Sequence, residues 1–276
     1  MTRFLTLLRW IVFLLAAFAL NFPLIATLVA ALKSEAEIAE NPSLLIEAPT
    51  LENFAKVFEI SDRFDIAHYL VNSLIAASLG SLFAILLSFP AAYAIVRQGV
   101  GQRWLLPGVT NLRAIPLIIF SIPIYLIYQR LALLDTRFGL ALILCLVNLP
   151  LVLVLVANAV RDLPIEIEEA ALVDGASTFY VLWRVVLPLT APAIASSLIL
   201  AFIYAWNEFL FGLMLTTQSA VPITVGASFF FAASGGGVQW GTAAAVMILS
   251  VLPPLLLSLL TYRYIGRSLT AGAVKG

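Results

Sequence analysis

Charged side chains are scarce in this sequence: 11% of its 276 residues are Asp, Glu, Lys or Arg, whereas 62% are hydrophobic. A soluble domain of this size cannot cover so much apolar surface, so the composition predicts a protein surrounded largely by lipid. The formal net charge is zero, which provides no excess of positive charge to attract nucleic acid. The shortage of charge therefore argues against a soluble protein and against a nucleic-acid partner.

Residues that carry covalent chemistry are also few. Cys145 is the single cysteine and lies in an apolar run, which excludes an internal disulfide, and His68 is the single histidine. No nucleophile–base–orienter set and no cluster of metal ligands stands out, so we predict no catalytic residue and no metal site. None of Lys33, Lys56 and Lys275 follows a glycine, as the Walker A loop requires. The chain is therefore predicted not to bind ATP through that motif.

Long apolar runs are abundant by contrast. Six of them can cross a hydrocarbon core of roughly 30 Å, which takes about 20 helical residues. Each must be helical, because lipid offers no partner for backbone N–H and C=O groups. The first run is longer than the core of a signal peptide and is interpreted as a retained helix. The sequence thus predicts one all-α membrane domain over 1–276, with helices near 10–32, 69–96, 104–129, 138–160, 193–216 and 241–262.

The distribution of basic residues predicts the orientation. With both termini cytoplasmic, nine basic residues lie inside and five outside, and three of those five belong to one acidic segment, 33–68. Because Lys and Arg accumulate in cytoplasmic loops, this arrangement is the favoured one. The inner set is Arg3, Arg9, Arg97, Arg103, Arg161, Arg184, Arg263, Arg267 and Lys275, and the outer set is Lys33, Lys56, Arg63, Arg130 and Arg137.

Two outer segments carry further features. In 33–68, Thr50 is a candidate cap for a short helix with Asn53 at the third position. One face of this helix is apolar, so the helix either lies in the membrane interface or forms a surface for a periplasmic partner. The segment 217–240 has no charge and an apolar patch too short to span a membrane. It is either re-entrant or a loop facing the periplasm.

Ionisable groups inside the spans are Arg113 and Glu208. A charge in lipid is costly, so both should face the protein interior, a cavity or each other. The prolines of the third run predict a broken helix, and only a shift of its register would let the two groups pair. Tyr204, Trp206 and Asn207 lie near Glu208 and suit sugar rings, although aromatic residues in membrane helices more often serve packing. These five residues are candidates for a translocation path or gate, and a structural hydrogen bond of Glu208 is an equally good interpretation.

The segment 161–192 is long for a plain connection. Asp162 is predicted to cap a helix whose first turn includes Pro164, and Gly175 is predicted to end that helix in the left-handed conformation. Ser177 or Thr178 can cap a second helix, which Pro188 is predicted to end.

These restrictions together predict a rigid docking element facing the cytoplasm. The small pair Ala170-Ala171 permits close approach of another backbone, and Glu169 can fix its orientation through a hydrogen bond or an arginine.

The pattern Glu169-Ala170-Ala171, then Gly175, then Leu187-Pro188 resembles the cytoplasmic EAA motif of ABC importer permeases, with Val185 where isoleucine is usual. Over almost its full length the chain also resembles the shorter permease subunit of maltose-type carbohydrate importers. The residues that carry this second resemblance are Asn72-Ser73-Leu74, Leu133-Leu-Asp-Thr136, Trp206-Asn-Glu-Phe209 and Gly272-Ala-Val-Lys-Gly276.

The resemblance implies a multi-pass protein of the bacterial inner membrane that works with a second, homologous permease. Two ATPase subunits would bind ATP and Mg²⁺, a periplasmic binding protein would deliver a sugar or sugar derivative, and this chain would bind no cofactor. Residues that it implies in ATPase coupling are Glu169, Ala170, Ala171, Asp174, Gly175, Leu187 and Pro188. An ABC permease for a non-sugar solute remains an alternative. An ion-coupled secondary transporter is a weaker one, because it should show inverted repeats and several embedded acids.

Overall fold

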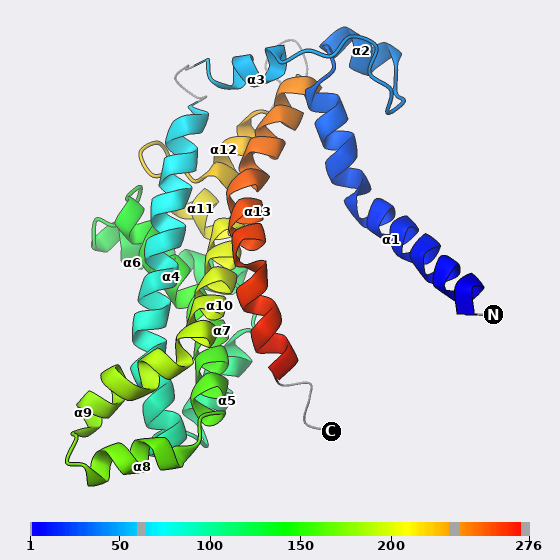
Figure 1. Cartoon of the computed structure of the whole chain (residues 1–276). Coiled ribbons are helices and arrows are strands. Elements are labelled where there is room, and N and C mark those ends of the chain that lie inside the picture. Colours follow the sequence, from blue (N-terminus) through cyan, green and yellow to red (C-terminus); the bar gives the residue numbers. More distant parts are fainter. Residues whose placement is uncertain (1, 60–64, 232–237, 272–276) are drawn as a thin grey trace. The chain divides into compact units, whose positions relative to one another are not determined.

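The computed structural model describes residues 2–59, 65–231 and 238–271, and these are helical with no strand among them. The chain divides into two compact units. Unit 1 comprises Met1–His68 and Gly226–Leu252, and unit 2 comprises Tyr69–Val225 and Pro253–Gly276. Figure 1 shows the course of the helices.

Five helices of the described chain are long and apolar enough to cross a membrane. They are α1 (Thr2–Ala31), α4 (Ile66–Arg97), α7 (Arg137–Arg161), the continuous stretch Thr178–Trp206 that ends in α10 (Leu187–Trp206), and α13 (Trp240–Ala271). These cover five of the six predicted runs.

The predicted run 104–129 is not one helix. It folds as α5 (Leu105–Leu112) and α6 (Ile118–Arg130), and residues 113–117 between them are not helical. Pro116 lacks the N–H that a continuous helix would use and disfavours a helical conformation of the residue before it, which explains the break. The predicted run 193–216 also divides, since α10 ends at Trp206 and a short α11 (Leu210–Leu215) follows.

Unit 1 contains the acidic segment, with α2 (Glu35–Glu40) and α3 (Glu52–Val57). Lys33 is buried, and its Nζ donates to the carbonyls of Asn41 and Ser43, 2.8 Å from each. Asn53 is buried as well and donates to the carbonyls of Ala31 and Lys33. The segment is therefore folded back on the end of α1 by buried polar contacts.

The predicted start of this short helix differs from the observed one. Leu51, not Thr50, is the N-cap of α3, and its side chain makes no cap hydrogen bond. The buried face carries Asn53 and Val57, whereas Leu51 and Phe58 are exposed. Asn53 was expected to complete a capping box begun by Thr50, but its amide donates to the carbonyls at the end of α1 instead.

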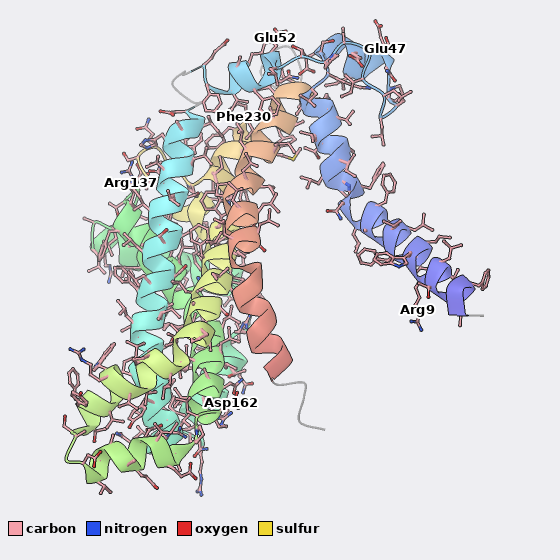
Figure 2. All side chains as sticks on the ribbon, in the orientation of Figure 1. Arg9, Glu47, Glu52, Arg137, Asp162 and Phe230 are labelled. Atoms are coloured by element: carbon pink, nitrogen blue, oxygen red, sulfur yellow. The ribbon has the colours of Figure 1, made fainter. Side chains whose placement is uncertain are left out.

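The core of unit 2 lies between α4, α7, the π-helical turn η1 (Leu182–Val186) and α10. Phe89 of α4, Val156 of α7 and Val186 are 1% exposed or less and belong to one hydrophobic cluster. α7 and α10 pack along one another, and α5 and α11 both pack against α7. The labelled residues Arg137 and Asp162 mark opposite ends of α7 in Figure 2.

Several hydroxyl groups inside the long helices are satisfied locally, although the buried Ser88 hydroxyl of α4 has no hydrogen-bond partner among the described residues. Thr190, Ser196 and Ser197 each donate to the carbonyl four residues earlier in their own helix. A hydroxyl bonded in this way is cheap to bury in an apolar surrounding, because it leaves no unpaired donor.

Candidate functional site

The segment after α7 forms a short helix, a tight turn and a second helix at one end of unit 2. α8 (Ile165–Val173) begins after Pro164, whose backbone is extended, and Asp162 is the C-cap of α7 instead of the predicted N-cap of this helix. The reason is that α7 continues to Arg161, which leaves only three residues to turn the chain. Figure 1 shows α8 and α9 at the lower end of the helix bundle.

Gly175 provides the turn. Its φ is +88°, and its N–H donates to the carbonyl of Leu172 while that of Ala176 donates to Ala171. Left-handed backbone is accessible to glycine at no steric cost, which is why the helix ends here. Ser177 then caps α9 (Thr178–Val181) by accepting from the Tyr180 N–H.

The second helix does not end at Pro188, contrary to the prediction. α9, η1 and α10 form one continuous helical stretch from Thr178 to Trp206. Pro188 is tolerated because it stands in the first turn of α10, directly after a π-helical turn. A π-helical turn pairs an N–H with the carbonyl five residues earlier instead of four. Because of this change in pairing, fewer backbone groups lose a hydrogen-bond partner when proline lacks its N–H.

Several of the residues predicted for docking are exposed on this element, whereas Leu187 is half-buried against the core. Glu169, Ala170, Asp174 and Gly175 are exposed, and Ala171 is half-buried against the core. Large apolar side chains surround them in the open, among them Val173 at 87% exposure and Phe179 at 74%. An exposed apolar patch is a common mark of a protein interface, and an exposed carboxylate beside it can fix the orientation of a partner.

Sequence reasoning missed the role of the acid beside the motif. Glu168 is buried, and its Oε1 lies 2.7 Å from the Nε of Arg97, the last residue of α4. The sequence offered one signal of this role. Neighbouring residues of a helix point in different directions, so Glu168 and Glu169 had to lie on different faces of α8.

The five residues predicted for a path or gate separate into two groups. Arg113, Tyr204 and Asn207 are exposed, and the Arg113 guanidinium lies 6.0 Å from the centre of the Tyr204 ring. Trp206 is buried and stacks against Phe202.

Glu208, like Trp206, makes contacts that support local structure. Its carboxylate accepts from the backbone N–H groups of Phe211 and Gly212, and so caps the start of α11. Its backbone carbonyl accepts from the Thr224 hydroxyl. No ion pair between Arg113 and Glu208 occurs in the described part of the chain, where the pairs are Lys33–Glu37, Lys56–Glu52 and Arg97–Glu168.

A second polar cluster lies at the other end of α7. Asp135, in the loop between α6 and α7, accepts from the backbone N–H groups of Thr217, Gln218, Ser219 and Ala220. Burial raises the pKa of this carboxyl, but the four backbone donors outweigh it and lower the pKa to about 2. The carboxylate therefore holds the turn after α11 in place at any physiological pH.

Asn72 extends this cluster. Its amide donates to the carbonyls of Ser219 and Val221, and its Oδ1 accepts from Arg137 at 2.6 Å. The adjacent Ser73 hydroxyl accepts from the N–H of Ile223 at the start of α12 (Ile223–Phe229). The segments that carried the carbohydrate-permease resemblance, at Asn72 and at Asp135, thus meet on one turn.

The fold has solved relatives. It superposes on a chain of a bacterial ABC transporter involved in the import of the acidic polysaccharide alginate, with a TM-score of 0.77, 20% sequence identity and coverage of 95% of this chain and 96% of that chain. A methionine ABC transporter gives a TM-score of 0.56 at 17% identity, over 73% of this chain and 93% of that one. The fold is therefore that of an ABC importer permease.

Residues 80–271 match the family described as binding-protein-dependent transport system inner membrane component, and the chain belongs to that family. The trehalose/maltose transport system permease protein of Thermococcus litoralis is 35% identical over 95% of this chain and 94% of its own length. The sulfoquinovosyl glycerol transport system permease protein of Agrobacterium fabrum is 31% identical over 92% and 89%. A trehalose transport system permease protein of Mycobacterium tuberculosis is 32% identical over 84% and 85%.

Proposed function

We propose that this chain is a permease subunit of an ATP-driven importer for a sugar or sugar derivative. It pairs with a second, homologous permease to form the translocation path. Two cytoplasmic ATPase subunits bind ATP and Mg²⁺, and a periplasmic binding protein delivers the solute. The class of solute rests on the relatives, whose names specify trehalose, maltose and sulfoquinovosyl glycerol.

The observation that carries the proposal is the exposed element formed by α8, Gly175 and α9. It presents Glu169 and an apolar surround at the end of a helix bundle. A rigid protrusion of this kind suits a groove on an ATPase subunit, because its shape is fixed by the left-handed turn and the Ser177 cap. Closure of the ATPase subunits on ATP would then rock the permease between inward-facing and outward-facing states.

The solute path is proposed to run along Arg113, Tyr204 and Asn207. These polar groups are exposed on the isolated chain although they lie within or at the end of otherwise apolar helices. In a membrane such a face has to meet protein or water. An aromatic ring beside a guanidinium and an amide provides stacking and directional hydrogen bonds for a sugar ring.

In the proposed orientation α8 and both termini are cytoplasmic, and the Asp135 turn faces the periplasm. The chain is then a multi-pass protein of the bacterial inner membrane. The α5–α6 pair would be the sixth crossing, broken at residues 113–117.

The test is co-purification of the ATPase subunit on the tagged chain, with the charge reversal Glu169→Lys. We expect the variant to recover much less ATPase, because its ammonium would replace the carboxylate on the docking surface. Asp162→Lys is the matched control, with the same charge reversal at the end of α7, and should recover the wild-type amount. Full recovery with Glu169→Lys, together with wild-type uptake, would remove the docking proposal.

A further inference from the structure

α8 is attached to unit 2 in an unusual way. Glu168 is the one buried residue of its nine, at 4% exposure, whereas Ile165, Ile167, Leu172 and Val173 are exposed. The next helical segment is attached differently, through Trp183, which packs its ring against Phe89 of α4. Apolar packing thus holds the second helix, and an ion pair holds the first.

The partner of Glu168 joins three elements at one point. Arg97 ends α4, and its Nε donates to Glu168 Oε1 at 2.7 Å. Its Nη2 donates to the carbonyls of Val160 and Leu163, 2.8 Å from each. These two carbonyls lie at the end of α7 and just beyond it, where helix geometry leaves acceptors unpaired.

A guanidinium suits this position better than any other cation. Its donors form a planar fork that can bond several acceptors at once, and it stays charged when buried. The side chains of Arg97 and Glu168 are 12% and 5% exposed, so water screens their attraction little. Tyr93, one turn earlier in α4, also interacts with the Glu168 carboxylate.

We propose that Arg97 and Glu168 are a positioning pair that makes α8 move as one body with α4 and α7. The inference rests on the proposed function, in which α8 docks on an ATPase subunit. A force applied to α8 by the ATPase then reaches α4 and α7 through the guanidinium. Without the guanidinium, α8 would be joined to α7 by the short link after Arg161 and by the half-buried Ala171, and to the Trp183 anchor by the turn at Gly175. We expect α8 then to follow the ATPase while α7 stays behind.

The test measures the distance from α8 to α7 by pulsed electron paramagnetic resonance. Nitroxides are placed at Val173 and Leu146, both exposed, on a Cys145→Ala background. The full chain is measured in nanodiscs alone and in complex with its companion permease and ATPase, without nucleotide and with ATP and vanadate. We expect one narrow distance that is the same in every state.

Arg97→Met and Glu168→Gln should lose the single narrow peak and shift the distance upon trapping with ATP and vanadate. Arg97→Lys should show an intermediate effect, because an ammonium keeps the charge without the fork. Recovery of the ATPase should persist, since the Glu169 surface is unchanged. Arg161→Met is the matched control: this exposed arginine bonds Asn158 in its own helix, and its loss should leave the distance narrow.

Two results would overturn the proposal: a narrow, state-independent distance in Arg97→Met, or a wild-type distance that itself shifts on trapping. A purely structural role predicts lower yield and a lower melting temperature with no dependence of the distance on nucleotide. If the wild-type chain recovered no ATPase, the proposed function would fail. The distances measured in the chain alone would still test whether Arg97 and Glu168 hold α8 in place.

Discussion

Asp135 and Glu208 each hold a segment by accepting hydrogen bonds from consecutive backbone N–H groups. Asp135 serves the turn at residues 217–220 and Glu208 the first turn of α11. A carboxylate has two oxygens and about four acceptor positions, so one side chain can order several amides. At both residues the charge is used for local structure.

Asp135→Asn should destabilise the protein by about 1 kcal/mol at neutral pH. The amide keeps one oxygen acceptor and loses the charge, and solvent at this partly exposed site weakens the loss. The measurement is the thermal midpoint of the detergent-solubilised chain. Asp162→Asn, at the other end of α7, is the control and should leave the midpoint unchanged.

The same pair of proteins tests the pH dependence. The folded pKa of Asp135 is about 2, below the usual 3.8, so its contribution is present above about pH 4 and lost as the pH falls through about 2. The difference in midpoint between wild type and Asp135→Asn should therefore shrink between pH 5 and pH 2. A difference that stayed constant over this range would show that the charge is not the stabilising feature.

Two substitutions of Glu208 distinguish a role as a helix cap from a role as a gate of the translocation path. Glu208→Gln keeps a carbonyl oxygen for the Phe211 and Gly212 amides and should retain most of the uptake, whereas Glu208→Ala removes the cap and should cost about 1 kcal/mol of stability. Uptake and thermal midpoint are measured for both variants. Loss of uptake in Glu208→Gln with an unchanged midpoint would favour the gate.

At the scale of elements, the turn between α8 and α9 depends on backbone conformation. Gly175→Ala should cost roughly 1–2 kcal/mol, because an L-residue is strained at φ +88°. A Cβ added there meets nothing within 4 Å, so the effect is strain alone. Thermal midpoint and recovery of the ATPase should both fall.

Gly108→Ala is the matched control for that substitution. Gly108 lies within α5, its φ is not positive, and an added Cβ also meets nothing within 4 Å. Alanine should therefore be neutral or stabilising there, by up to about 1 kcal/mol. Equal losses in the two variants would contradict the assigned role of Gly175.

Much of this element could be predicted from the sequence because its signals are local. Gly175 favours a positive φ because it has no Cβ, and Ser177 favours a helix N-cap because its hydroxyl can accept from a backbone N–H. The positive φ and the cap are both observed as expected. Pro188 was misinterpreted because proline is compatible with both a helix end and a first turn, and only the π-helical turn before it decides. Arg97 and Glu168 lie 71 residues apart, and no local pattern predicts such a contact.

At the scale of the whole molecule, the proposed path makes a prediction on access. On a Cys145→Ala background, Asn207→Cys should react at least about tenfold faster than Leu146→Cys with a charged, membrane-impermeant thiol reagent, because the reactive thiolate forms where water reaches. Both positions are exposed on the isolated chain, so exposure alone does not separate them. The assembled importer is the sample, and equal rates would place Asn207 outside the path.

The continuous helical stretch from Thr178 to Trp206 has a mechanical consequence. Phe179 beside the docking turn and Tyr204 on the proposed path belong to this one stretch, which measures roughly 38 Å along its axis at 1.5 Å per residue and bends between α9 and α10 (Figure 1). Tilting the stretch by about 5° around its docking end displaces the other end by at most about 3 Å. The π-helical turn that accommodates Pro188 thus keeps intact the arm that would carry a small rotation at the ATPase to the ring of Tyr204.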